Sequence, residues 1–171
     1  MKWMITVLSC AVLMGCVTKP QQVNPVQNFQ LQRYLGQWYE IARLDHSFER
    51  GMTQVTAEYS MREDGGVRVL NRGYNRQSQQ WSDAEGKAYF VKSEDLGFLK
   101  VSFFGPFYGS YIVFELEKDN YDYAFVSGPD HSYLWLLSRT PHVSDELKQK
   151  FKSQAGELGF NINNLIWVEQ D

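Results

Sequence analysis

The chain has 171 residues and a formal net charge of −3, with no run of basic residues along it. This length suits one domain, and the mildly acidic balance excludes the basic surface that nucleic-acid-binding proteins need. Aromatic residues are abundant, with 5 Trp, 10 Tyr and 11 Phe. Such a composition favours β-sheets and supplies large rings that either fill a core or line a pocket.

Cysteine and histidine usage excludes several kinds of chemical site. Both cysteines, Cys10 and Cys16, precede residue 17, so the rest of the chain has no thiol. A disulfide framework, a thiolate metal site and a cysteine nucleophile are thereby excluded from the domain. The histidines lack the spacing of zinc ligands, and we expect neither a metal nor a non-covalent cofactor.

A signal peptide is predicted for residues 1–15. Lys2 precedes an uncharged apolar stretch, 3–14, which is shorter than the roughly 20 residues of a membrane-spanning helix. The stretch ends in Leu13-Met14-Gly15-Cys16, which resembles the lipobox of bacterial lipoproteins. That resemblance implies cleavage before Cys16, with a diacylglycerol on its sulfur and an acyl group such as palmitate on its new amino terminus. The alternative is an ordinary secretory signal beside a chance cysteine.

The residues after the cleavage site predict where the protein is held. Val17 follows Cys16 directly and is similar to the residue at this position in lipoproteins sorted to the outer membrane, so we expect the periplasmic face of that membrane. Residues 16–28 are polar and contain Pro20 and Pro25, as expected of an acylated tether. Residues 29–171 contain no repeat or long linker and are predicted to be one domain.

Period-two alternation of apolar and polar residues predicts eight strands in this domain. The clearest strand covers residues 54–61, where the odd positions are apolar, and a glycine-containing turn joins it to a strand at 67–74. The other strands are predicted at 39–44, 86–91, 98–104, 111–117, 123–127 and 133–138. Eight short strands at this spacing favour an antiparallel barrel or sandwich.

One helix is predicted after the strands. Ser144 is its expected N-cap, Asp145 and Glu146 suit the positive end of the helix dipole, and Gly159 is the expected stop. A last apolar segment, 165–168, is expected to return as an edge strand.

Three short motifs occur in an order that resembles the lipocalin family. Gly36-Gln37-Trp38-Tyr39 resembles the G-x-W signature of the first strand, Asn120-Tyr121-Asp122-Tyr123 is similar to the second motif, and Leu137-Ser138-Arg139 is similar to the third. The runs 38–43 and 103–109 resemble the bacterial outer-membrane lipocalins in particular. The resemblance implies an all-β fold, an eight-stranded up-and-down antiparallel barrel with one C-terminal α-helix and a short final strand. It also implies that Gly36, Trp38 and Arg139 close the barrel base, with Arg139 packed over the Trp38 ring.

Alternation outward from Trp38 and Arg139 predicts which residues face the barrel interior. They are mostly apolar or aromatic, with small residues between them, which suits an acyl chain. The candidate cavity residues from alternation are Glu40, Ala42, Val55, Ala57, Tyr59, Ala88, Phe90, Val101, Phe103, Tyr133, Trp135 and Leu137, and Tyr108 of the aromatic rim loop is added to them. Alternation alone does not distinguish a hollow barrel from one that its side chains fill, and the family resemblance favours a cavity.

Two features of the expected interior have alternative explanations. Glu40 could bind a polar head group, or a nearby Tyr or Arg could satisfy it. The aromatic segment 103–108 lies in a loop of the expected open rim, where it could line the mouth, touch a membrane or plug the barrel end.

The resemblance implies a lipoprotein that stores or transports fatty acids or lysophospholipids for membrane maintenance. The alternative is a membrane-anchored filled barrel that binds a protein partner and no ligand. Both faces of the strand at 111–117 are apolar, so part of the barrel exterior must be covered. The helix could cover one patch and a second subunit another, which predicts a homodimer.

Two Asp-His-Ser tripeptides, Asp45-His46-Ser47 and Asp130-His131-Ser132, are predicted on the same rim. A Ser, a His and an Asp from these loops could form a catalytic triad. No G-x-S-x-G elbow accompanies them and no oxyanion hole is evident, and exposed loops commonly carry such residues. We therefore expect no enzymatic activity.

Overall fold

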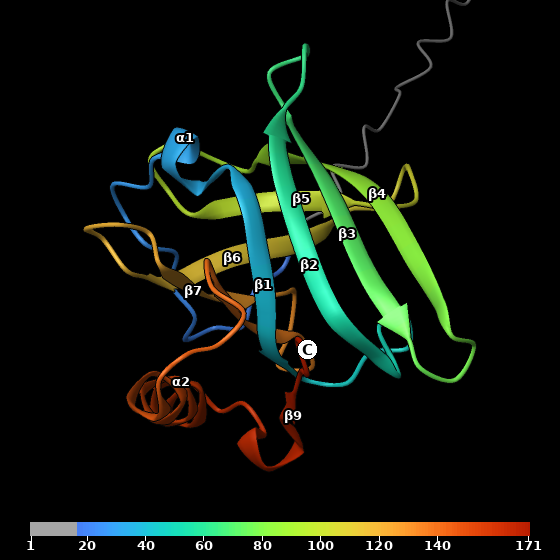
Figure 1. Ribbon diagram of the computed structural model, residues 1–171. Helices are drawn as coiled ribbons and strands as arrows, with labels where there is room; N and C mark the ends of the chain where they lie inside the picture. The colour runs from blue at the N-terminus through green and yellow to red at the C-terminus, as the bar shows by residue number, and fades with distance from the viewer. Residues whose placement is uncertain (1–16) are drawn as a thin grey trace, which may run out of the picture.

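The structure, a computed structural model, describes residues 17–171 (Figure 1). Cys16 and the predicted signal peptide lie outside the described residues. The strands are β1 (Gly36–Arg43), β2 (Met52–Met61), β3 (Val67–Asn75), β4 (Gln80–Phe90), β5 (Phe98–Ser102), β6 (Gly109–Leu116), β7 (Tyr123–Ser127), β8 (Leu134–Ser138) and β9 (Ile166–Trp167). The helices are α1 (Leu31–Tyr34), α2 (Asp145–Glu157) and the 3-10 helix η1 (Ile162–Asn164).

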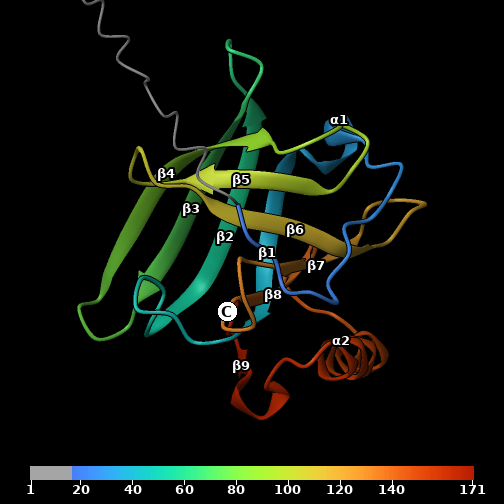
Figure 2. The ribbon, with the colours of Figure 1, turned by 180° about the vertical axis from the view of Figure 1, so that it is seen from behind.

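The strands β1 to β8 form a closed antiparallel barrel. Each pairs with the next along the chain, and β8 pairs with β1 to complete the circuit. The predicted eight-stranded up-and-down barrel, with one C-terminal helix and a short final strand, is confirmed. The loops after β1, β3, β5 and β7 lie at one end, the open rim, whereas α1 and the loops after β2, β4 and β6 lie at the other (Figures 1 and 2).

The seam between β1 and β2 closes over only half its height. Residues 36–39 of β1 pair with β2, but Ala42 and Arg43 pair instead with β9. The last residues of the chain thus occupy the place that β2 leaves. The barrel is sealed there by its own C-terminus.

Apolar side chains form two clusters, one on each side of the barrel wall. The interior cluster includes Trp38, Val113 and Val126, and the exterior cluster lies between the wall and α2. In the exterior cluster, the Phe151 ring of α2 packs edge-on against Phe125 of β7, with ring centroids 4.9 Å apart. Within residues 17–171, no helix is both long and apolar enough to cross a membrane.

The chain itself covers the outer face of β6. Ile112 is fully buried in the exterior cluster, together with Val23 from the segment before the barrel and Phe160 from the segment after α2. The apolar outer face that predicted a homodimer is therefore covered within one chain. The homodimer remains a prediction without that support.

The segment expected to be a tether packs along the barrel. The Val26 amide donates to the Val113 carbonyl at 2.9 Å, and the Gly97 amide donates to the Val26 carbonyl at 2.9 Å. Residues 17–28 thus run along the outside of the wall before the chain enters the barrel base at Phe29.

Strand β4 begins six residues before the predicted start at residue 86. Residues 80–85 have no alternation, because they are exposed on both faces of the strand. Their backbone partners are residues 70–75 of β3, and the Arg68 and Glu85 side chains form an ion pair across the hairpin at 2.7 Å. Backbone pairing and opposite charges extend this strand where burial does not.

Candidate functional site

The base of the barrel is closed by the three residues that the family resemblance assigned to it. The Arg139 guanidinium lies 3.8 Å from the centroid of the Trp38 ring. It also donates hydrogen bonds to the carbonyls of Gln37 and Arg33, both at 2.8 Å. Gly36 has a φ of +91°, in the left-handed region that favours glycine. These contacts join α1, β1 and the end of β8 into a base without an opening at the Trp38 ring.

Three tyrosines form a layer above this base. The hydroxyl of Tyr111 lies 2.7 Å from that of Tyr34 and 2.8 Å from that of Tyr59, so each phenol is satisfied inside the barrel. Burial raises the pKa of all three, which keeps them neutral. The rings hold together β2, β6 and the α1 segment.

The enclosed space beside this tyrosine layer is small. It is lined by apolar and aromatic side chains, including Phe29, Val69 and Leu99, and its volume is about 10 Å³. That is room for one water molecule. The space beside the tyrosine layer is therefore too small for an acyl chain, so the cavity expected in the barrel interior would have to lie elsewhere.

Most of the predicted cavity residues lie on the interior side of the wall. Tyr59, Ala88 and Leu137 are buried in the interior cluster. Partly buried against it are Ala57, Phe90, Val101, Phe103 and Trp135. Val55 is buried beside Gly73 of β3, and Tyr133 packs on Gly128 and His46. Ala57 and Trp135 remain partly exposed on this interior face, as does Val101, which also lines the small space beside the tyrosine layer.

The prediction that Ala42 lines the cavity is wrong, because Ala42 lies in the exterior cluster. Pairing of β1 with β8 shifts register between Glu40 and Ala42, so Ile41 is an extra residue and the alternation reverses beyond it. Arg43 consequently points inward, where sequence alternation placed Ala42.

The prediction that Tyr108 lines the cavity is also wrong. Lys100 Nζ lies 5.0 Å from the centroid of its ring, and the Tyr89 ring is 6.3 Å away. Lys100 and Tyr89 alternate with the interior residues Leu99 and Ala88, so both belong to the outer face of the wall. Tyr108 therefore folds over the outside of the barrel rather than into its mouth.

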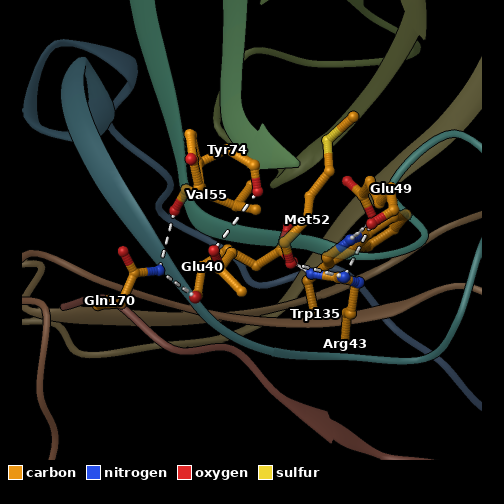
Figure 3. A network of polar contacts seen from close by, with 9 residues as sticks. Glu40, Arg43, Glu49, Met52, Val55, Tyr74, Trp135 and Gln170 are labelled. Carbon is orange, nitrogen blue, oxygen red and sulfur yellow. Dashed lines mark hydrogen bonds and ion pairs between the residues drawn. The ribbon is translucent and has the colours of Figure 1, made fainter. Parts of the chain in front are cut away.

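A buried charged cluster lies on the interior side near the open rim (Figure 3). Arg43 donates from Nη1 to Glu40 Oε1 at 2.7 Å and from Nη2 to the Glu49 carbonyl at 2.8 Å. The Glu49 carboxylate accepts from Trp135 Nε1 at 3.2 Å. Glu40 was expected either to bind a polar head group or to pair with a nearby Tyr or Arg. The structure shows the second alternative, with Arg43 as the partner.

Burial controls the protonation of this cluster. It raises the pKa of Glu40 well above its ordinary value, with the neighbouring Glu49 adding to the shift and Arg43 opposing it. Burial likewise raises the pKa of Glu49, against the hydrogen bond from Trp135. Both shifts favour the protonated carboxyls, so burial reduces the negative charge that this pair carries inside the barrel.

Sequence reasoning missed Arg43 and Glu49 as interior residues. Arg43 faces inward only because of the bulge, and Glu49 lies in a loop that periodicity does not describe. The available signal was the pair Ile41 and Ala42, two successive apolar residues that interrupt the alternation, as expected where two residues of one strand oppose a single partner residue.

The structure brings neither His46 nor His131 into a catalytic triad. The His46 ring stacks on Tyr133 with centroids 4.2 Å apart, and burial lowers its pKa. The His131 Nε2 atom lies 2.9 Å from the Leu158 carbonyl. Within residues 17–171, no group of three or more His, Cys, Asp or Glu residues could hold a metal ion.

Comparison with known proteins agrees with this architecture. Residues 29–170 match the model of the lipocalin-like domain. The chain is 60% identical over 167 residues to the outer membrane lipoprotein Blc of Vibrio cholerae, covering 97% of this chain and 98% of that protein. It is 54% identical over 153 residues to outer membrane lipoprotein Blc of Escherichia coli K12, covering 90% and 86% of the two chains.

A solved structure supports the fold alone. Insecticyanin from the tobacco hornworm Manduca sexta superposes with a TM-score of 0.69 at 20% sequence identity, over 90% of this chain and 87% of that one. The barrel order, the Trp38–Arg139 base and the matched domain together show that the chain belongs to the lipocalin family.

Proposed function

We propose that this lipocalin is an outer-membrane lipoprotein, acylated at Cys16, that binds fatty acids or lysophospholipids through their acyl chains. The names of its relatives support the membrane assignment. The lipobox-like sequence before Cys16 supports the acylation and a position on the periplasmic face. Storage or transport of such lipids for membrane maintenance, without a chemical reaction, is the corresponding role.

The observation that carries this proposal is the apolar interior surface above the tyrosine layer. Ala57, Val101 and Trp135 lie on it and remain partly exposed. An acyl chain laid on this surface loses contact with water, at about 0.8 kcal/mol for each buried CH₂ group. The proposed site is therefore the upper half of the barrel, because the enclosed space of about 10 Å³ beside the tyrosine layer does not hold a chain.

The charged cluster beside this surface supports an acyl-chain ligand rather than one recognised by charge. Both Nη atoms of Arg43 are already hydrogen-bonded, to Glu40 and to backbone carbonyls. A carboxylate or phosphate head group would then stay near the open rim, where water solvates it. The interior contributes burial and shape.

Lipid extraction from the purified mature protein tests the proposal. We expect a fatty acid or lysophospholipid in about equimolar amount by mass spectrometry, and displacement of a fluorescent fatty acid by palmitate. Trp135→Ala removes a large part of the apolar surface and should weaken that affinity by about tenfold. Trp81→Ala, on the outer face of β4, is the matched control and should bind normally.

A lipid-free protein that excludes the fluorescent fatty acid would support the filled barrel that binds a protein partner. Sedimentation equilibrium of the same sample tests the homodimer separately. Mass spectrometry of the amino-terminal peptide tests the diacylglycerol and N-acyl groups on Cys16, the only covalently attached groups that we propose.

A further inference from the structure

The seam between β1 and β2 is closed in two different ways along its height. Near the base, residues 36–39 of β1 pair with β2, and beyond them the two strands part. Residues 166–171, which we call the closing segment, lie in the gap. The first two residues of this segment form β9 and pair with Ala42 and Arg43 of β1. The closing segment thus takes the position next to β1 that β2 has left.

The closing segment is also hydrogen-bonded to β2. The Gln54 amide donates to the Glu169 carbonyl, and Gln54 Nε2 donates to the main-chain oxygen of Asp171, both at 2.6 Å. Gln54 has a φ of +51°, in the left-handed region that favours glycine. A residue keeps such a strained conformation only where its surroundings hold it. Strand β2 is therefore strained at the residue that binds the closing segment.

The proposed ligand surface lies beside this joint. Gln170 Nε2 bridges the carbonyls of Glu40 and Val55 (Figure 3). Ala57, two residues further along β2 than Val55, is one of the partly exposed residues of the ligand surface. Release of the closing segment would open the wall next to that surface.

The closing segment is held less firmly than other parts of the wall. All six of its residues are partly or fully exposed. The loop after β1, which borders the same joint at the rim, instead buries His46 and Glu49. Strands β3 and β4 pair through nine residues each. Because a segment with few buried contacts and short pairing opens at a lower free energy, the upper half of this seam is where we expect the wall to open first.

An acyl chain needs the wall to move. The enclosed space beside the tyrosine layer is about 10 Å³, whereas pockets for small molecules usually have about 300–1,000 Å³. Paired strands keep a spacing of about 4.8 Å, so a part of the wall that is paired over its full height does not widen. The β1–β2 seam can widen, because the exposed closing segment spans it towards the rim.

We infer that the closing segment is a releasable strand, which leaves β2 when an acyl chain enters the barrel. This inference rests on the proposed function and describes how ligand binding at that site is regulated. The acyl chain binds the open seam and the closing segment stabilises the closed one, so the two compete. The apparent affinity for lipid is then reduced by the fraction of molecules in which the seam is open.

Removal of the closing segment tests this competition. We would compare the intact mature protein with a variant that ends at Trp167, by displacement of a fluorescent fatty acid with palmitate. The truncated protein should bind palmitate about tenfold more tightly, because binding no longer breaks the contacts with β2. A purely structural role of the segment predicts the opposite, since an incomplete wall should hold a ligand less well.

Gln170→Ala is a milder variant that keeps the whole chain, so it decides the question if the truncated protein fails to fold. The substitution removes the bridge between the Glu40 and Val55 carbonyls. It should tighten palmitate binding by about threefold or more.

Two controls distinguish release of the seam from a general loosening of the barrel. Gln77→Ala changes an exposed glutamine in the loop between β3 and β4. Asp64→Ala loosens the other end of β2, because the Asp64 carboxylate accepts from the Gly66 amide and the Tyr89 hydroxyl. Both controls should keep the affinity for palmitate within about twofold of wild type.

Hydrogen exchange followed by mass spectrometry observes the release itself. With saturating palmitate, peptides that contain Gln54 or residues 166–171 should exchange faster than in the free protein, because their shared hydrogen bonds are broken in the complex. Peptides from the β3–β4 hairpin should exchange at an unchanged or lower rate.

Equal or weaker palmitate binding in both seam variants would overturn the inference. Unchanged or slower exchange of the closing segment in the presence of palmitate would overturn it as well. Either result would leave the proposed function intact, because the protein still binds palmitate. Failure of the intact protein and of every variant to bind palmitate would instead refute the proposed function, and the inference with it.

Discussion

The side chain of Gln170, next to the end of the chain, donates a hydrogen bond from Nε2 to the Glu40 carbonyl at 2.6 Å. The same nitrogen donates to the Val55 carbonyl of β2 at 3.0 Å (Figure 3). The Gln54 amide, in turn, donates to the Glu169 carbonyl at 2.6 Å. The C-terminal residues thereby satisfy backbone groups that β1 and β2 expose where they part.

The first prediction concerns this seam. Gln170→Ala removes both hydrogen bonds and leaves two partly buried carbonyls unpaired, so we expect a loss of about 1–2 kcal/mol in the free energy of unfolding. Urea denaturation followed by tryptophan fluorescence measures it. Gln77→Ala, at an exposed position in the loop between β3 and β4, is the control and should cost nothing measurable. Equal stability of the two variants would show that the C-terminus does not hold the seam.

The second prediction concerns the base. Arg139→Lys keeps the positive charge but loses the planar fork that reaches the Gln37 and Arg33 carbonyls while lying over the Trp38 ring. We expect a loss of about 1–3 kcal/mol in the free energy of unfolding. Arg50→Lys is the matched control, because Arg50 makes only an exposed ion pair with Asp45, and such pairs contribute little. A loss no larger than that of the control would contradict the role of Arg139.

The third prediction concerns pH. The raised pKa of Glu40 means that the folded state holds a proton that the unfolded state releases above the ordinary glutamate pKa. This contribution to stability is complete at low pH and is lost as pH rises through the folded pKa. We expect the free energy of unfolding to fall as pH rises above the ordinary glutamate pKa, and Glu40→Gln, which resembles the protonated carboxyl, to flatten that decline.

The pKa of His46 shifts in the opposite direction, and His46 is present in both wild type and Glu40→Gln. Burial lowers its pKa, so its contribution is lost as pH falls. The difference between wild type and Glu40→Gln therefore removes the His46 contribution and reports on Glu40 together with the neighbouring Glu49 carboxyl. Urea unfolding across the pH range measures the slopes, with Glu94→Gln on the exposed loop after β4 as the control. Parallel slopes in wild type and Glu40→Gln would argue against a buried, protonated Glu40.

The fourth prediction separates the tyrosine layer from the proposed ligand surface. Tyr111→Phe deprives the Tyr34 and Tyr59 hydroxyls of their shared partner and should cost about 1–2 kcal/mol of stability. Fatty-acid affinity should stay within about twofold, because the acyl chain lies above this layer. Tyr108→Phe, on the outer wall, should change neither quantity. A strong loss of affinity in Tyr111→Phe would place the chain deeper in the barrel than we propose.

Much of the fold followed from local pattern. Alternation in 54–61, the glycine-containing turn after it and the capped helix after Ser144 each gave an element close to the observed one, and the Ser144 side chain accepts from the Leu147 amide at 3.2 Å. Strand β4 was predicted too short, because its first six residues are exposed on both faces and leave no periodic trace. Backbone pairing with β3 gives residues 80–85 their strand conformation.

The candidate site was less predictable than the fold. One extra residue in β1 reversed the alternation, which moved Ala42 out and Arg43 in. Tyr108 turned to the outer wall because Lys100 and Tyr89 offer it a cation and a ring there. Neither outcome follows from spacing, since both depend on a neighbouring strand.

The β-rich architecture could be inferred from periodicity, which is a local property, and the family and the residues of the base from the resemblance of three short motifs. How closely side chains pack inside the barrel, which side of its wall several residues occupy and where the first described residues lie became evident from the folded structure alone. Those features arise from side-chain volumes and contacts between residues far apart in the chain: three tyrosines meeting at Tyr111, Gln170 bridging two strands and Thr18 bound at the rim. Such contacts form only once the barrel has closed.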